Sequence, residues 1–170
     1  MKDINQPFIF DIKISHKPYR FQLYDTASPE NWTLLSPHII VLCYDISTRL
    51  SLINVQRLVC NSSPQSQITL LTVSQWSKEI HRVFPHLAES TPVLLLGLKR
   101  DLRSEEDPNG IIYPQEAYRI AQEMRCDKYM ECSAVSGELL SEVWEDISRT
   151  AVGSAEAQGG GLSSGGCVVC

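Results

Sequence analysis

Two short, continuous apolar runs constrain the fold of this chain more than any other feature. Residues 39–44 (IIVLCY) and 93–96 (VLLL) each have the length of a strand and carry no charged side chain. A strand with one solvated face alternates apolar and polar residues, whereas a strand covered on both faces is apolar throughout. Strands of this second kind belong to parallel sheets that lie between layers of helices. The sequence therefore predicts an α/β fold.

Strands and helices alternate along the rest of the chain. A hairpin with its turn at residues 16–18 comes first, Ser47 and Ser51 are candidate caps of a helix, and Pro114 stands where a proline can start another helix. The expected elements are strands at 8–15, 19–24, 39–44, 93–96 and 128–132, with helices from about residue 52, at 115–125 and at 139–150. This order indicates an open, mostly parallel sheet with a small antiparallel edge.

Composition restricts the possible functions. The chain has 170 residues, of which 43% are hydrophobic and 21% charged, which suits one globular domain. Its net charge of -5 argues against nucleic acid as a partner, because such proteins carry clustered Lys and Arg. Cys43, Cys60, Cys126 and Cys132 lack the spacing of metal ligands, so we expect them to be small buried residues.

Residues 59–75 interrupt an otherwise regular helix. Without them Leu58 would be followed by Trp76, and one apolar face would continue through the junction at helical spacing. The codons that can encode the ends of this segment also match the signals of a short fungal-type intron. We therefore hypothesise a retained intron translated in frame; the alternative is a genuine surface insertion with an extra strand at 68–73. Sequencing the transcript distinguishes the two.

Three loops with polar residues follow predicted strands. They are GLKRDL at 97–102, ECSA at 131–134 and YDTA at 24–27, and all three are expected at the carboxyl edge of the sheet, where α/β folds bind ligands. Together these loops resemble the guanine-reading and switch loops of small GTPases of Rho type, in a fungal-type form. The resemblance implies the open α/β sheet of P-loop NTPases as the fold, guanine nucleotide with Mg²⁺ as ligands, and Rho-type effectors and regulators as partners.

The resemblance gives four residues a role in reading the base. Asp101 would accept two hydrogen bonds from the guanine edge, and the stem of Lys99 would pack along the base. Ser133 and Ala134 would form the second base loop. Leu98 departs from the family pattern, which has Asn or Thr at this position to brace the neighbouring loops.

The resemblance also places a switch loop after the second strand. Asp25, Thr26 and Ala27 would bind nucleotide there, with Asp25 holding Mg²⁺ through water. Ser28 replaces the glycine that donates to the γ-phosphate, and Pro29 stands where the family has the glutamine that orients water. Proline has no side-chain or backbone N–H to donate. Hydrolysis of GTP is therefore expected to be slow or absent.

The sequence has no G-x-x-x-x-G-K-[ST] loop, the motif that holds phosphates and Mg²⁺ in this family. We expect residues 1–152 to form a Rho-like domain that lacks the first strand, P-loop and first helix, so that the fold is incomplete at its N-terminus. The first strand lies in the middle of the family's sheet, so its neighbours would face a gap or pair with each other. Tight binding of GTP is not expected.

Residues 153–170 are rich in Gly, Ser and Ala and predict a flexible tail. Its last four residues, CVVC, fit a C-a-a-X box that would carry a prenyl group on Cys167. The alternative is an unmodified terminus. The expected location is the cytoplasm, with reversible membrane association if the single lipid is added.

These observations leave three hypotheses open. The chain is an incomplete form of a Rho-type GTPase switch, a Rho-shaped module that binds partners without nucleotide, or a mis-spliced product with no function. The intact base loops around Asp101 and Ser133 favour the first, because a scaffold has little need to read guanine.

Overall fold

The computed structural model describes residues 7–14, 16–25, 37–60, 91–103, 111–157 and 167–169. Its elements in chain order are β1 (Phe8–Ile14), β2 (Lys17–Leu23), β3 (Ile40–Asp45), α2 (Arg49–Cys60), β4 (Val93–Leu98), the 3₁₀ helix η1 (Arg100–Leu102), α4 (Pro114–Glu123), β5 (Lys128–Glu131), α5 (Leu140–Ala157) and β6 (Cys167–Val169). The strands and helices predicted from the sequence are therefore present. Most of residues 59–75, together with Thr26, Ala27 and Pro29, lie outside the described ranges.

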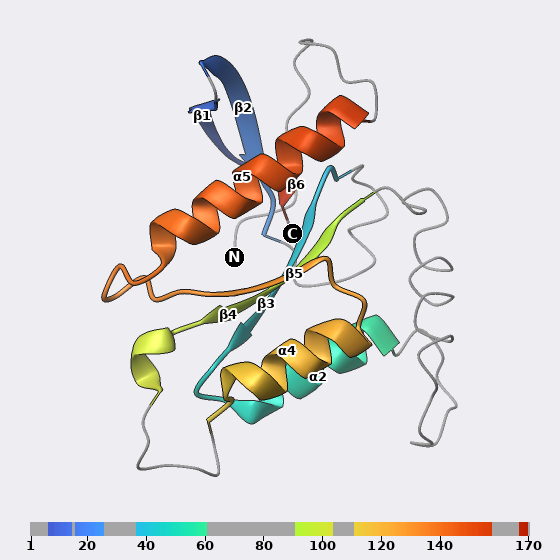
Figure 1. Ribbon diagram of the computed structural model, residues 1–170, viewed down its shortest axis with the longest axis vertical. Helices are drawn as coiled ribbons and strands as arrows, with labels where there is room; N and C mark the ends of the chain where they lie inside the picture. The colour runs from blue at the N-terminus through green and yellow to red at the C-terminus, as the bar shows by residue number, and fades with distance from the viewer. Residues whose placement is uncertain are drawn as a thin grey trace.

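The strands form two sheets of three strands each. β1 and β2 make an antiparallel hairpin, and β6 pairs with β2 in parallel, so the first sheet has the order β1-β2-β6. The second has the order β3-β4-β5 with all strands parallel. β6 lies in the space between β2 and β3 (Figure 1). The expected gap beside β2 is thus occupied, by a segment from the other end of the chain.

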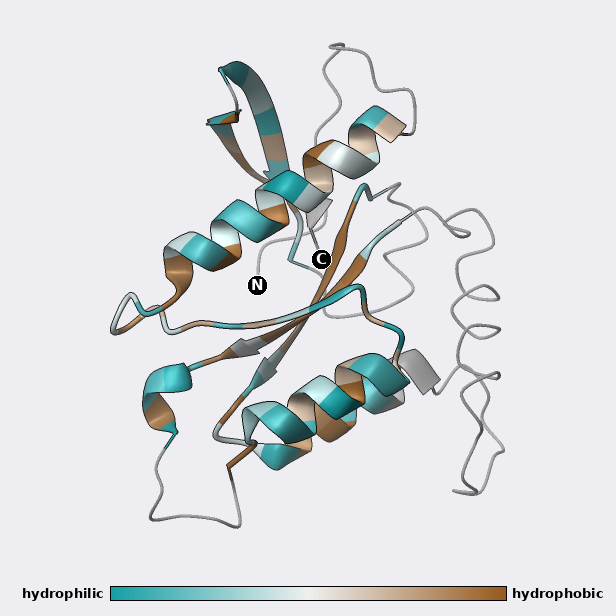
Figure 2. Ribbon diagram, in the orientation of Figure 1, coloured by the Kyte–Doolittle hydropathy of each residue, from teal (hydrophilic) through white to brown (hydrophobic). Residues whose placement is uncertain are grey.

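Helices cover both faces of the sheet β3-β4-β5, as the apolar runs predicted. α2 and α4 lie side by side on one face, and α5 crosses the other face and continues over the hairpin (Figure 1). The apolar sides of these helices face the strands (Figure 2). One core, with Leu42, Leu95 and Ile112, lies under α2 and α4. The second, with Phe21, Leu94 and Ile147, lies under α5 and joins the two sheets.

All three helices differ from their predicted bounds, α4 by one residue at its start and two at its end. α2 begins at Arg49, and Ser51 lies in its first turn, where its hydroxyl donates to the carbonyl of Asp45 at 2.9 Å. α5 ends at Ala157, so the helix continues past Gly153, where the flexible tail was expected to begin. Alanine-rich sequence favours helix, and Ser154 is buried against the rest of the fold.

The cysteines are less uniform than expected. Cys132 is buried and Cys126 half-buried, but Cys43 is exposed, which corrects the prediction that it is a buried residue. Cys43 lies on the same face of β3 as Val41, which is part of the core under α5. The continuous apolar run at 39–44 predicted burial at every position, and the structure buries all of them except Cys43.

Candidate functional site

The loops that follow β4 and β5 meet at the carboxyl edge of the sheet. The backbone N–H of Arg100 donates to the carbonyl of Cys132 at 3.2 Å, and the N–H of Cys132 donates to the carbonyl of Gly97 at 2.9 Å. Between them Lys99 has a φ of 60°, in the left-handed region that a residue with a side chain seldom adopts. Such strained positions cluster at functional sites. The two loops predicted to act together are therefore physically joined.

Asp101 and Ser133 form the direct link between the two loops. The hydroxyl of Ser133 donates to the carboxylate of Asp101. The same oxygen accepts the backbone N–H groups of Val135 at 3.2 Å and Ser136 at 3.1 Å, so it also fixes the turn after β5. Ser133 is fully buried, whereas Asp101 and Ala134 are exposed. The buried Ser133 hydroxyl thus fixes the position of the Asp101 carboxylate, and Asp101 itself is exposed to solvent, where a ligand could reach it.

Lys99 is tied to the end of the neighbouring strand β3. Its ammonium lies 2.7 Å from Asp45 Oδ2, while Asp45 Oδ1 accepts the N–H of Ser47 at 2.8 Å and its hydroxyl at 2.6 Å. Burial alone would raise the pKa of Asp45, but the hydrogen bonds from Lys99 and Ser47 outweigh it and hold the pKa below its usual value. The Lys99 side chain stays 58% exposed, which leaves its stem accessible.

Asp25 lies at the same edge, just after β2, and is exposed. It acts on the Cys43 thiol from nearby. Partial desolvation by the surrounding protein, with smaller contributions from Cys132 and Asp25, raises the pKa of the Cys43 thiol to about 11. The thiol is therefore protonated at neutral pH and a poor nucleophile.

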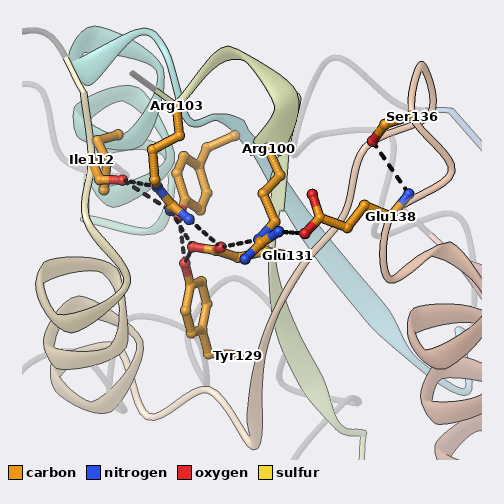
Figure 3. Close-up of polar contacts among 8 residues, drawn as sticks. Arg100, Arg103, Ile112, Tyr129, Glu131, Ser136 and Glu138 are labelled. Atoms are coloured by element: carbon orange, nitrogen blue, oxygen red, sulfur yellow. Dashed lines mark hydrogen bonds and ion pairs between the residues drawn. The ribbon is translucent and has the colours of Figure 1, made fainter. Parts of the chain in front are cut away.

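A buried ionic network supports the base loops from beneath (Figure 3). Glu131, at the end of β5, is 8% exposed and accepts hydrogen bonds from Arg103 and Tyr129. Arg100 Nε lies 3.4 Å from Glu131 Oε2, and the same guanidinium pairs with Glu138. Burial opposes the charge on Glu131, but these hydrogen bonds and charges keep its pKa below the usual value.

Two further contacts link this network to the core. Arg103 donates to the carbonyl of Ile112 at 3.0 Å, and the hydroxyl groups of Tyr44 and Tyr129 lie 3.0 Å apart. Burial raises the pKa of Tyr44 to about 12. Gly97 makes room for this arrangement, because a Cβ there would lie 2.8 Å from the Tyr44 hydroxyl oxygen. The two loops after β4 and β5 are therefore joined to the core by one connected set of hydrogen bonds and ion pairs around Glu131, which we call the support.

Sequence reasoning did not identify this support. Its one signal was Glu131 itself, a charged residue that ends a short strand directly before the small residues of the second base loop. A charge at a buried strand position needs a partner. Its partners, Arg100 and Arg103, are distant in sequence, and only the parallel pairing of β4 with β5 brings them close.

The structure brings together four of the residues that the sequence predicts for the site. Asp101, Lys99, Ser133 and Ala134 gather where a base could lie between the two loops. Within the described ranges, no group of three or more His, Cys, Asp or Glu side chains is arranged to hold a metal ion. Nor does any helix in those ranges have the length and apolar character needed to cross a membrane.

Comparison with known proteins agrees with this geometry. The family model described as the Ras family matches residues 62–152, just over half of the chain and including most of the segment 59–75. GTP-binding protein rho2 of Schizosaccharomyces pombe is 28% identical over 178 residues, which cover 95% of this chain and 78% of that protein. Ras-like GTP-binding protein RhoL of Drosophila melanogaster is 30% identical over 156 residues, or 84% of this chain and 70% of that protein. GTP-binding protein RHO2 of Saccharomyces cerevisiae is 28% identical over 156 residues, which cover 85% of this chain and 70% of that protein.

The sheet, its covering helices and the joined loops define an α/β protein of the nucleotide-binding class. The chain belongs to the Ras family and within it is a Rho-like small GTPase, with an incomplete form of the family's sheet.

Proposed function

We propose that this chain is a Rho-type switch protein that recognises the guanine base through Asp101. The observation that carries the proposal is the bond between Ser133 and Asp101, which presents an exposed carboxylate between the two loops. Two parallel acceptor oxygens match the N–H pair on the guanine edge, and adenine has no such pair. The stem of Lys99 packs along the base, and Ala134 borders it.

The affinity is expected to be low. Two charge-assisted hydrogen bonds contribute roughly 1.5–3 kcal/mol each, a gross sum of about 3–6 kcal/mol that corresponds to dissociation constants near millimolar. Asp25 is the residue proposed to hold Mg²⁺ through water, and Thr26 and Ala27 complete that loop. With Pro29 in place of the family's glutamine, hydrolysis is expected to be very slow.

Ligand-observed NMR at millimolar concentrations tests the proposal directly. We expect saturation transfer from the protein to guanosine and much less to adenosine. Asp101→Ala should remove the difference between the two nucleosides. The matched control is Asp11→Ala, which removes an exposed carboxylate on β1, paired with Arg20 far from the loops. Equal signals for guanosine and adenosine with the unaltered chain would refute base recognition by Asp101.

One observation favours a second candidate, a Rho-shaped module that acts without nucleotide. Lys99 and the support around Glu131 already have partners within the chain, so the loops are ordered by the protein's own residues. Such a module would bind Rho-type effectors or regulators through its surface alone. Binding to these partners that is unchanged by Asp101→Ala and by added GTP would favour it over the switch.

The tail is proposed to carry a prenyl group on Cys167 that brings the protein reversibly to membranes from the cytoplasm. The support is the sequence CVVC after a glycine-rich segment. Mass spectrometry of the protein isolated from eukaryotic cells tests this: the C-terminal peptide should carry the added mass of a prenyl group, and Cys167→Ser should remove it.

A further inference from the structure

The two sheets leave a strand-wide slot between β2 and β3. β2 is hydrogen-bonded to β1 on one side, and β3 is hydrogen-bonded to β4 on one side. The inner edge of each strand therefore presents backbone N–H and C=O groups, and such edges are templates for a further strand. Phe21 of β2 and Val41 of β3 are both buried and belong to the same core under α5.

The structure places a segment of this chain in the slot. The backbone of residues 167–169 runs parallel to β2, with Phe21 opposite Cys167, Gln22 opposite Val168 and Leu23 opposite Val169. The same segment lies beside β3 and beside α5 (Figure 1). It is therefore in contact with both sheets and with the helix that joins them.

The sequence allows this return of the chain. Nine residues, 158–166, separate the end of α5 from β6, and five of them are glycine. Nine extended residues reach about 30 Å at most, enough to turn back along a helix of the length of α5. The valines at 168 and 169 have high strand propensity. A ladder of three residues is at the short end of the range for strands in proteins.

We propose that residues 167–169 are the resident strand of the slot between β2 and β3, and that the C-terminus alternates between this docked strand and a free tail. In the docked form the backbone of Cys167 is part of a sheet. Any partner that must take hold of the terminal residues in an extended form therefore competes with β2 for the same backbone groups. The proposal concerns docking alone and holds whether or not the chain binds guanine.

Hydrogen–deuterium exchange on the full chain tests the docking. A synthetic peptide of residues 158–170 serves as the unstructured reference. We expect the C-terminal peptide of the full chain to exchange at least about tenfold more slowly than the same residues of the reference. The linker 158–166 should exchange at the reference rate. C-terminal exchange at the reference rate in the full chain would overturn the proposal without any variant.

Two proline variants then locate the contact. Val168→Pro removes a backbone donor inside the ladder and should release both the C-terminal peptide and residues 21–23 of β2, while β4 and β5 keep their protection. Ser164→Pro, in the linker, should leave every rate unchanged. Protection of β2 that survives Val168→Pro would contradict the ladder. Protection that falls on dilution would also contradict the proposal, because it would show that the strand comes from a second copy of the chain.

Discussion

At the scale of single residues, the base loops depend on close packing beneath β4. Gly97→Ala would place a Cβ 2.8 Å from the Tyr44 hydroxyl oxygen and 3.0 Å from Ile46 Cδ1. Tyr44 is 2% exposed and hydrogen-bonded to Tyr129, so it cannot move freely. We expect a loss of about 1–3 kcal/mol in the free energy of unfolding, measured with urea. Gly153→Ala meets no atom within 4 Å and lies inside α5, so it should stabilise the protein by about 0.5–1 kcal/mol.

Glu131 makes the stability of the protein depend on pH. Its pKa is lower in the folded chain than its ordinary value of 4.5. The stabilisation from its ionised form is therefore fully present above that value and is lost as the pH falls through the lower, folded pKa. Glu131→Gln should cost up to about 3 kcal/mol at neutral pH, because it leaves the Arg103 guanidinium, whose side chain is only 16% exposed, without its counter-charge.

Urea unfolding between neutral pH and the acid range measures both effects. The unaltered chain should lose stability in acid more steeply than Glu131→Gln. The control is Glu145→Gln, whose ion pair with Arg149 is exposed and should change stability by no more than about 0.5 kcal/mol. Parallel pH profiles for the unaltered chain and Glu131→Gln would show that another group governs the acid transition.

At the scale of elements, the sequence predicted what depends on local pattern. The apolar runs at 39–44 and 93–96 identified β3 and β4, and the two loops that were expected to lie together after β4 and β5 are joined by the bond from Ser133 to Asp101. It did not predict the support around Glu131 or the pairing of β6 with β2. Both depend on contacts between residues distant in sequence, which no period within a short window encodes. The end of α5 was misplaced for the same reason, because the hairpin that it contacts is remote.

α5 is the element that joins the hairpin to the rest of the molecule. The ring of Trp144 packs edge-on against Phe10 of β1, with centroids 5.5 Å apart, and near the helix end Glu156 accepts the hydroxyl of Tyr19 at 3.2 Å. Trp144→Ala should lower the free energy of unfolding by about 3 kcal/mol and increase exchange in β1 and β2 more than in β4. Tyr118→Ala on α4 removes an aromatic ring that is 54% exposed and should change stability by no more than about 0.5 kcal/mol. Equal increases in all strands for Trp144→Ala would show that the hairpin has no separate dependence on α5.

At the scale of the whole molecule, the chain combines the proposed base site at Asp101 with a sequence that has no G-x-x-x-x-G-K-[ST] loop. In a complete site most of the affinity would come from N–H groups, a lysine and Mg²⁺ around the phosphates. Here the contacts come from Asp101, Lys99 and the loop at Ser133, which would contact the base alone. Each phosphate added to guanosine should therefore contribute little to the binding affinity.

Guanosine, GDP and GTP, the last two with Mg²⁺, are accordingly expected to bind with dissociation constants that agree within about threefold, near millimolar. Titration of the isotopically labelled chain, followed by the amide signals of residues 97–103 and 131–136, measures all three in the same way. ATP provides the control for phosphate binding that is independent of the base. If GTP bound a hundredfold more tightly than guanosine, about 2.7 kcal/mol of phosphate contacts would have to come from residues outside the base loops. Asp101 would then be one part of a complete nucleotide site, and the chain would hold GTP without a G-x-x-x-x-G-K-[ST] motif.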